Sequence, residues 1–253
     1  MRARLIGAIA TACFLCNSCA PRQEKARTLT VAAAANLSEV FQEAGRVFQQ
    51  ETGVAVVFSF GSTAQLAQQI SNGAPFDLFA AADTAHIDSL VVSGRLLAES
   101  RAIYAIGQLA LWSPKGGVKE LRDLLKPTVR FVALAQPDSA PYGKAAVEAL
   151  TQSGLWSGVK SKVVYSNSIS QAKQQAASGN ADAAFTAYSL VLHELGTVLK
   201  IDPGLHRAIE QALGIVALSK QTTDAQKFRA FLLTGNGRAI LEKSGYLLPP
   251  APK

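Results

Sequence analysis

The sequence predicts an α/β protein made of two domains with a cleft between them. From residue 29 onward, short runs rich in β-branched and aromatic residues alternate with longer amphipathic stretches, a pattern typical of sheets covered by helices. Two more strand-like runs, QLALWS from Gln108 and LGIVALS from Leu213, enclose residues 114–210, which show the same alternation. The chain is therefore expected to cross twice between two α/β blocks, and a single doubly wound domain is the alternative that this pattern leaves open.

Five further runs are expected to form strands, because each is rich in β-branched or aromatic residues and precedes an amphipathic stretch. These runs begin at Leu29 (LTVAAAA), Val54 (VAVVFSF), Phe76 (FDLFAAA), Arg130 (RFVALA) and Lys162 (KVVYS). The clearest helix begins near Leu37, where apolar residues recur at the spacing of one helical face, and Gly53 suits its end.

The two crossings set the expected domain boundaries. We expect residues 28–108 together with residues 217–253 to form the first domain, and residues 109–216 to form the second. The closing LLPPAPK is expected to be an unstructured end.

Residues 1–20 have the pattern of a signal peptide. Arg2 and Arg4 precede an apolar run that is too short to span a membrane, and small residues follow it. Cleavage before Cys19 would leave an N-terminal cysteine able to carry lipid, whereas ordinary cleavage after Ala20 is the alternative. The mature protein is therefore expected to be periplasmic or otherwise extracytoplasmic, either free or anchored through a lipidated Cys19.

The cysteines, the net charge and the motifs narrow the function. All three cysteines, Cys13, Cys16 and Cys19, lie in the expected leader, so the mature chain has neither a disulfide nor a cysteine metal site. With 25 Lys+Arg against 18 Asp+Glu, the chain has a modest positive field that suits small anions. No dense basic run with interleaved aromatic residues occurs, so nucleic acid is not an expected partner. The common hydrolase, nucleotide and metalloprotease motifs do not occur either, and no enzymatic function is expected.

Four expected strand-to-helix junctions share uncharged hydrogen-bond donors. They are AAAANLSE with Asn36, SFGSTAQL with Ser62 and Thr63, DSAPYGKAA with Tyr142, and YSNSISQA with Ser166, Asn167, Ser168 and Ser170. Helix N-termini present unpaired N–H groups and the positive end of the helix dipole, so two that converge can form an anion site without a charged side chain. Taken alone, each junction is better explained as an ordinary N-cap, because Ser, Thr and Asn are the preferred capping residues.

The donor set also bears on which anion fits. A protonated phosphate needs an acceptor for its proton, whereas molybdate, tungstate and sulfate at neutral pH do not, so a site made of donors alone disfavours phosphate. Asp138, near the third junction, is the carboxylate that would supply such an acceptor, although turn or cap chemistry is its more ordinary role.

Long stretches of the sequence resemble one known family. The strings VAAAANLSEVFQEAG, FSFGSTAQLAQQISNGAPFDLFAAAD and LLTGNGRAILEKSGY are similar to the periplasmic molybdate-binding proteins, and the resemblance runs from about Leu29 to Leu247. It implies a hinged, two-domain periplasmic-binding-protein fold that closes on a tetrahedral dianion through hydrogen bonds alone. It also implies no cofactor, with molybdenum held only as its oxyanion and no direct bond from protein to metal.

The same resemblance implies which residues contact the anion. The matching positions are Asn36, Thr63 with Ser62 beside it, Tyr142, and the backbone N–H of Ile169. A fifth position, which is tyrosine in some members, is Ala187 here, and this departure leaves the adjacent Tyr188 as a candidate ligand.

The expected function is that of a receptor, acting as a monomer, which captures molybdate or tungstate and delivers it to the permease and ATPase of an ABC importer. The alternatives are a binding protein for another anion such as sulfate, or for ferric ion. A ferric site would need clustered tyrosines with histidine or carboxylate ligands, which the five tyrosines of this chain neither require nor exclude.

Overall fold

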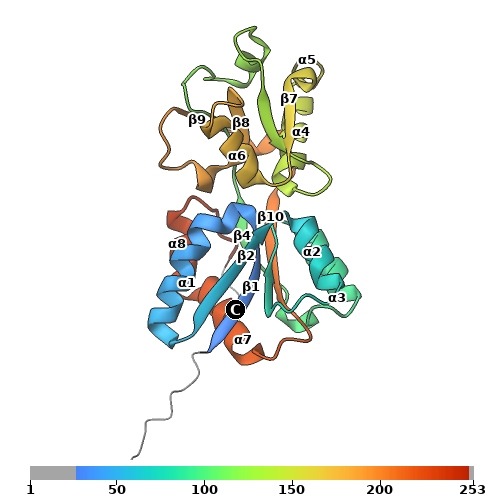
Figure 1. Cartoon of the computed structure of the whole chain (residues 1–253), viewed down its shortest axis with the longest axis vertical. Coiled ribbons are helices and arrows are strands. Elements are labelled where there is room, and N and C mark those ends of the chain that lie inside the picture. Colours follow the sequence, from blue (N-terminus) through green and yellow to red (C-terminus); the bar gives the residue numbers. More distant parts are fainter. Residues whose placement is uncertain (1–26, 251–253) are drawn as a thin grey trace, which may run out of the picture.

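The computed structural model describes residues 27–250. It contains two five-stranded sheets, each flanked by helices, and the two α/β domains lie one above the other (Figure 1). The predicted α/β class and two-domain organisation are confirmed. The expected signal peptide, including Cys19, lies outside the described residues.

The first domain is built on a sheet of order β2-β1-β3-β10-β4, in which β1 runs parallel to β2 and β3 while β10 runs antiparallel to β3 and β4. Its strands are β1 (Thr28–Ala34), β2 (Ala55–Gly61), β3 (Leu78–Ala80), β4 (Ala102–Gly107) and β10 (Ile209–Ile215). Its helices are α1 (Ser38–Thr52), α2 (Thr63–Ser71), α3 (Ala85–Val92), α7 (Thr222–Thr234) and α8 (Asn236–Lys243). In Figure 1, α1 and α8 lie on one side of this sheet, and α2 and α3 lie on the other.

The second domain repeats this plan with a sheet of order β7-β6-β8-β5-β9. Its strands are β5 (Leu109–Ser113), β6 (Val132–Ala135), β7 (Val163–Ser166), β8 (Ala183–Ala187) and β9 (Thr197–Lys200), and its helices are α4 (Pro141–Gln152), α5 (Trp156–Val159) and α6 (Ile169–Ala177). Here β6 runs parallel to β7 and β8, and β5 runs antiparallel to β8 and β9. In both domains, therefore, the parallel strands end at the edge that faces the other domain, where the following helices begin (Figure 1).

The chain crosses between the domains twice, but the second crossing lies earlier than the sequence indicates. It passes from β4 to β5 at Gly107 and Gln108, and it returns between β9 and β10. Because β10 pairs with β3 and β4 in the first sheet, residues 209–216 do not belong to the second domain, and the expected boundary at residue 216 is wrong. The exposed Glu210 and the polar Gln211 interrupt the apolar run that would have marked the strand's true start.

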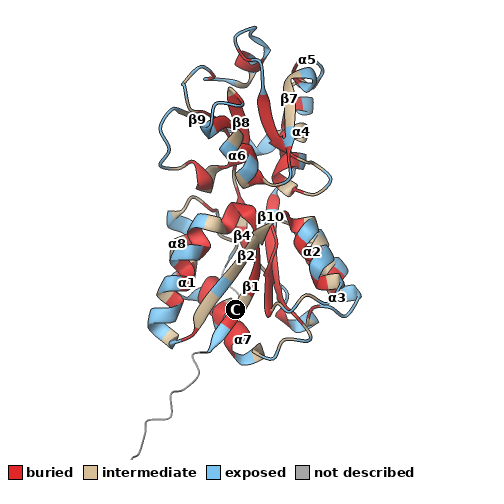
Figure 2. Ribbon diagram, in the orientation of Figure 1, coloured by how far each residue is buried: buried red, intermediate tan, exposed pale blue. Residues whose placement is uncertain are grey.

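Local sequence accounts for how the helices begin and end. The apolar face of α1, including Phe41 and Phe48, is buried against α7, where both rings contact Phe228 edge-on. The helix ends at Gly53, whose φ of 71° lies in the left-handed region that glycine adopts without a steric cost. Figure 2 shows the result, with buried strands at the centre of each domain and helices that expose their outer faces.

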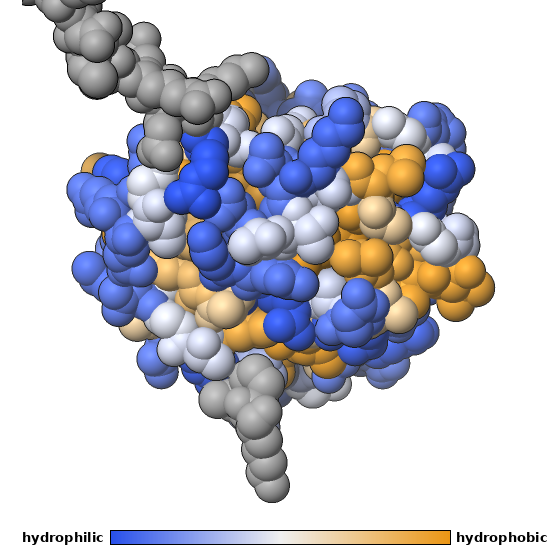
Figure 3. Space-filling model, turned by 90° about the horizontal axis from the view of Figure 1, so that it is seen from below, coloured by the Kyte–Doolittle hydropathy of each residue, from blue (hydrophilic) through white to orange (hydrophobic). Residues whose placement is uncertain are grey.

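The outer surface is mixed in character. Seen from the far end of the first domain, polar side chains alternate with apolar areas (Figure 3). Val92 and Leu218 are among the exposed apolar residues of this domain. Among residues 27–250, no helix is both long enough and apolar enough to cross a membrane.

Candidate anion-binding site

Four helix N-termini, two from each domain, meet at a small cavity between the domains. The cavity is lined by Ala34, Ala35, Asn36, Gly61, Ser62, Thr63, Ala82, Ala140, Pro141, Tyr142 and Ile169. Its volume is about 10 Å³, which is close to the room that one water molecule needs. Five of the six residues predicted to contact an anion are thus brought together at one place.

Asn36 enters the cavity from the first junction. β1 ends at Ala34 and is followed by a 3-10 turn over Ala35–Leu37, which leads directly into α1. The Asn36 side chain is almost fully buried, and its Nδ2 donates to Gln211 Oε1 and to Tyr246 OH, both at 3.0 Å. Its Oδ1 has no hydrogen-bond partner among the described residues. One end of this amide is therefore engaged by the protein and the other is not.

Ser62 and Thr63 form the start of α2. Ser62 is the N-cap, and its Oγ accepts from Gln65 N while Gln65 Oε1 accepts from Ser62 N, which completes a capping box. Thr63 Oγ1 accepts from Ala82 N at 3.1 Å. Both hydroxyls have their acceptor side occupied by backbone N–H groups, so their own protons remain available for a bound anion.

Tyr142 comes from the second domain. Pro141 occupies the first turn of α4, where its missing N–H costs no hydrogen bond, and Tyr142 follows it. Burial raises the pKa of the Tyr142 phenol well above its usual range; the nearby Tyr246 raises it further, and a hydrogen bond with Gln211 opposes the rise. The phenol is therefore protonated at all physiological pH values. Because its oxygen accepts from Gln211 Nε2 at 2.9 Å, its proton is left to donate elsewhere.

Ile169 supplies the fourth N-terminus, that of α6. Ser168 caps this helix by accepting from Gln171 N at 3.3 Å, and the buried Ile169 is the first helical residue, whose N–H has no intrahelical partner. The next residue, Ser170, donates from Oγ to Ala35 O of the first domain at 2.8 Å. The start of α6 is thus fixed against the turn that carries Asn36.

The lining contains no charged side chain. Its polar groups are the amide of Asn36, the hydroxyls of Ser62 and Thr63, the phenol of Tyr142 and the N–H groups of the helix starts. Asp138, the carboxylate near the third junction in the sequence, is exposed and does not line the cavity. The positive ends of the helix dipoles are therefore not neutralised by an acid in the lining, which favours an anion.

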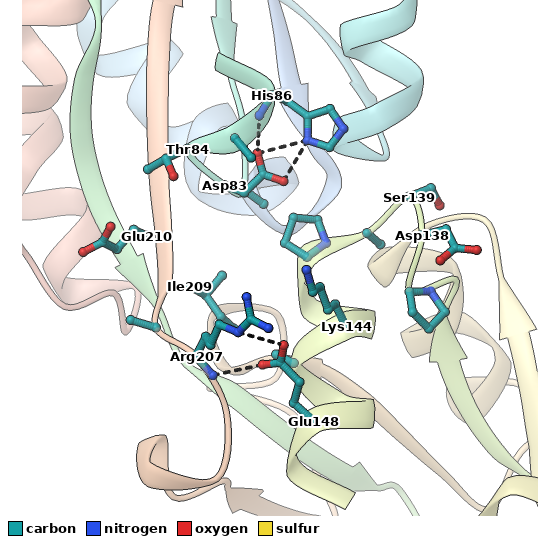
Figure 4. A pocket seen from close by; sticks show the side chains of 17 residues that line it. Asp83, Thr84, His86, Asp138, Ser139, Lys144, Glu148, Arg207, Ile209 and Glu210 are labelled. Carbon is teal, nitrogen blue, oxygen red and sulfur yellow. Dashed lines mark hydrogen bonds and ion pairs between the residues drawn. The ribbon is translucent and has the colours of Figure 1, made fainter. Parts of the chain in front are cut away.

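A second and much larger cleft lies beside this cavity, with a volume of about 560 Å³ (Figure 4). It shares Ala82, Ala140 and Pro141 with the small cavity. Charged side chains of both signs line it, including two ion pairs: His86 Nδ1 to Asp83 Oδ2 at 2.8 Å, and Arg207 Nε to Glu148 Oε1 at 3.4 Å. Size alone would favour this cleft as the binding site, but four carboxylates line it, so the smaller cavity is the better anion site.

Tyr188 is the one predicted ligand that the structure does not bring to the cavity. It follows the end of β8, and Lys200 Nζ lies 3.9 Å from the centre of its ring. Its neighbour Ser189 does not line the cavity either, but Ser189 Oγ donates at 3.0 Å to the OH of Tyr246, which in turn accepts from Asn36. The departure of this chain from tyrosine at position 187 is thus not compensated by the adjacent tyrosine.

Three buried residues behind the cavity, Tyr104, Gln211 and Tyr246, were not singled out from the sequence. Together with Tyr142, two of them form a group of three buried phenols. Burial raises the pKa of Tyr104 and of Tyr246, so both stay protonated. Phenolate ligands for ferric ion are therefore disfavoured here, and the described residues contain no group of three or more His, Cys, Asp or Glu that could hold a metal ion.

Comparison with known proteins agrees with this geometry. Residues 29–247 match the bacterial extracellular solute-binding protein family. The molybdate-binding protein ModA of Rhodobacter capsulatus is 36% identical over 218 residues, covering 85% of this chain and 86% of that protein. ModA of Azotobacter vinelandii is 36% identical over 228 residues, covering 88% and 90%.

Solved structures show the same likeness. The Azotobacter vinelandii periplasmic molybdate-binding protein aligns with a TM-score of 0.85 at 32% identity, over 87% of this chain and 99% of that one. The sulfate-binding protein SubI of Mycobacterium tuberculosis aligns with a TM-score of 0.74 at 20% identity, which is a likeness of fold alone.

Proposed function

The chain belongs to the bacterial extracellular solute-binding proteins, and from this membership we propose that it captures molybdate or tungstate outside the cytoplasm and delivers it to an ABC importer. It is a binding protein and not an enzyme. The observation that carries the proposal is the cavity itself, in which donors from both domains converge without any charged side chain. The relatives named as molybdate-binding proteins, at 36% identity, support the choice of ligand.

The contacts of the anion follow from the lining. From the first domain, Ser62 and Thr63 would donate side-chain hydrogen bonds. Asn36 would join them once its amide turns, because both Nδ2 protons are bonded to Gln211 and Tyr246 in this arrangement. From the second domain, Tyr142 would donate from its phenol and Ile169 from its backbone N–H. Because each domain holds part of the donor set, an anion that bridges them stabilises the closed arrangement relative to an open one.

Capture requires the cavity to widen. A tetrahedral oxyanion is larger than the single water that the cavity has room for, so the domains must part before it enters. Several short-ranged polar contacts hold the domains together. Among them, Ala64 N donates to Ser139 O at 3.3 Å, Ser170 Oγ donates to Ala35 O, and Gln211 Nε2 donates to Tyr142 OH. Rotation about the two crossings would break them and open the site.

The donor set favours fully deprotonated dianions. Molybdate, tungstate and sulfate accept hydrogen bonds at every oxygen, whereas phosphate at neutral pH carries a proton that needs an acceptor. A phosphate hydroxyl left unpaired in a buried cavity costs about 1–3 kcal/mol, or about 5- to 150-fold in affinity. The choice between sulfate and the larger anions depends on the size of the closed cavity, and here the proposal rests on the relatives.

The transport role adds a partner and a location. We propose that the closed, loaded protein docks on the permease and ATPase of an importer, as a monomer. We also propose that it is exported by its leader and either released or anchored by lipid at Cys19.

The test is calorimetric titration of the mature, ligand-free protein with molybdate, tungstate, sulfate and phosphate at neutral pH. We expect one-to-one binding of molybdate and tungstate, with sulfate weaker and phosphate weakest. Equal affinity for sulfate would make the protein a general oxyanion receptor. No heat with any of the four would refute the proposal.

A further inference from the structure

Behind the cavity lies a connected set of five buried polar side chains, which we call the amide–phenol network. Its members are Asn36, Tyr104, Tyr142, Gln211 and Tyr246, each 3% exposed or less. None of them carries a charge. Asn36 and Tyr142 also line the cavity, so the network joins the anion site to the interior of the first domain.

Gln211 is the centre of this network. Its Oε1 accepts from Asn36 Nδ2 and from Tyr104 OH, both at 3.0 Å, and its Nε2 donates to Tyr142 OH at 2.9 Å. Asn36 belongs to the first domain and Tyr142 to the second. One side chain therefore touches a proposed anion donor of each domain.

Two backbone features place Gln211 there. The pairing of β10 with β4 is irregular between Gln211 and Ala212, and Tyr104 is the extra residue on β4. Such a bulge re-aims side chains, and here both Gln211 and Tyr104 are buried and meet. Gly107 supplies the space: a Cβ on it would overlap Tyr142 OH and lie only 2.6 Å from Gln211 Nε2. A side chain at this crossing would separate the two residues.

We infer that Gln211 is a positioning residue of the anion site, which fixes Asn36 and Tyr142 so that donors of both domains are oriented together. The inference rests on the proposed function. It also explains the unpaired Asn36 Oδ1, because a half-turn of the Asn36 amide would give that position to Nδ2, a donor for the anion. Asn36 would then offer Oδ1 to Gln211, which must turn with it to present Nε2. The Oε1 of Gln211 would then accept from Tyr142 OH, so in each orientation one of the two residues, and not both, keeps a proton for the anion.

This coupling requires an amide at position 211. An amide has a donor end and an acceptor end, so it can serve Asn36 in either orientation and still bond Tyr142. A carboxylate only accepts, so Gln211→Glu would bind Asn36 Nδ2 and Tyr142 OH at once and hold both donors away from the anion. Gln211→Met has a similar length but makes no hydrogen bond, so it would leave both donors untethered.

The experiment compares affinity for molybdate with stability in the ligand-free state. We expect Gln211→Met to weaken binding at least about tenfold and Gln211→Glu at least about a hundredfold, from the loss of one or two hydrogen bonds to a charged ligand. The matched control is Ser100→Ala, which removes a buried hydroxyl that accepts from Ile215 N at the other end of β10. It should lower the unfolding temperature and leave affinity unchanged.

A double-mutant cycle separates positioning from general structure. If Gln211 acts through Tyr142, Gln211→Met should cost less affinity in the Tyr142→Phe background than in the wild type. The inference alone would be overturned if Gln211→Met weakened binding by the same factor in both backgrounds. It would also be overturned if the variants at position 211 bound as tightly as the wild type. Wild-type protein that binds neither molybdate nor tungstate would instead overturn the proposed function. If Gln211→Glu does not fold, the affinity of Gln211→Met and the double-mutant cycle test the role of Gln211 without it.

Discussion

Replacing Asn36 by aspartate is the sharpest single perturbation of the proposed site. The two side chains have the same shape, so the variant changes charge and hydrogen bonding with little change in volume. Asn36 is 1% exposed and lines the cavity, so the new carboxylate has little water to solvate it. It would stand beside the bound dianion with no cation in the lining to offset it.

The size of the effect is set by protonation. Two unit charges 4 Å apart at an effective dielectric constant of 20 interact by about 4 kcal/mol, so a carboxylate beside a dianion is repelled by about 8 kcal/mol. Protonating the carboxylate before the anion binds costs less. An aspartate has an ordinary pKa near 3.9, about 3.1 units below pH 7, so protonation at pH 7 costs about 4 kcal/mol. The Asn36→Asp variant should therefore bind with its carboxyl protonated and lose up to about a thousandfold in affinity at pH 7.

The affinity of the Asn36→Asp variant should also depend on pH. Each binding event takes up one proton, so affinity of the variant should improve up to about tenfold for each unit by which the pH falls between 8 and 6. The wild-type cavity is lined by no charged side chain, so its affinity should change little over the same range. Calorimetry in two buffers of different ionisation enthalpy measures the proton uptake directly.

The matched control is Asn180→Asp, which adds the same charge at an exposed position of the second domain. It should leave affinity within about twofold, because exposed charges are strongly screened. An Asn36→Asp variant with wild-type affinity would remove Asn36 from the site. Weak binding without proton uptake would refute the electrostatic explanation while leaving a role for the side chain.

Three further outcomes are expected. Tyr188→Phe should keep wild-type affinity in the same titration, because its phenol does not reach the cavity. Lys173→Met breaks an interdomain ion pair with Glu39 at 3.1 Å, and should weaken binding by at most about fivefold, a difference that 1 M salt abolishes. The pKa of His86 is raised, mainly by its hydrogen bond with Asp83, against a smaller opposing effect of burial. This contribution to stability is present below pH 6.5 and lost as pH rises through the raised pKa, so thermal unfolding of His86→Gln should differ from wild type at pH 6 and converge by pH 9.

Strong local patterns predicted much of the fold. All seven runs expected to be strands overlap one, although the run from Leu213 covers only the last three residues of β10, and the helix expected near Leu37 is α1, ending at Gly53. Three strands, β4, β8 and β9, were not expected. β8 has the sequence AAFTA, in which alanine dominates, and β9 has only the four residues TVLK, too few to show the alternation that identifies a strand. Their place comes from pairing with β5, a contact that local sequence does not encode.

Part of the site could likewise be predicted from local sequence, and part could not. The helix starts that line the cavity are local features, and uncharged donors at strand-to-helix junctions indicated them. The network behind them is not local: Gln211 lies 175 residues from Asn36 and 69 from Tyr142 in the sequence. A buried glutamine in a strand gives no signal of its own. Tyr188 does not line the cavity for a related reason, because adjacent residues at the end of a strand point to different sides.

The absence of charged side chains from the cavity suits a receptor that must also release its ligand. A lysine or arginine would attract the anion over a long range and would hold it even with the domains apart. Hydrogen-bond donors and helix dipoles act within about the first helical turn, so their hold depends on close contact. When the domains part, Asn36 and Thr63 stay on one side and Tyr142 and Ile169 on the other, and each half retains only part of the donor set. Opening therefore lowers affinity by more than the loss of any single contact, as the proposed delivery to an importer requires.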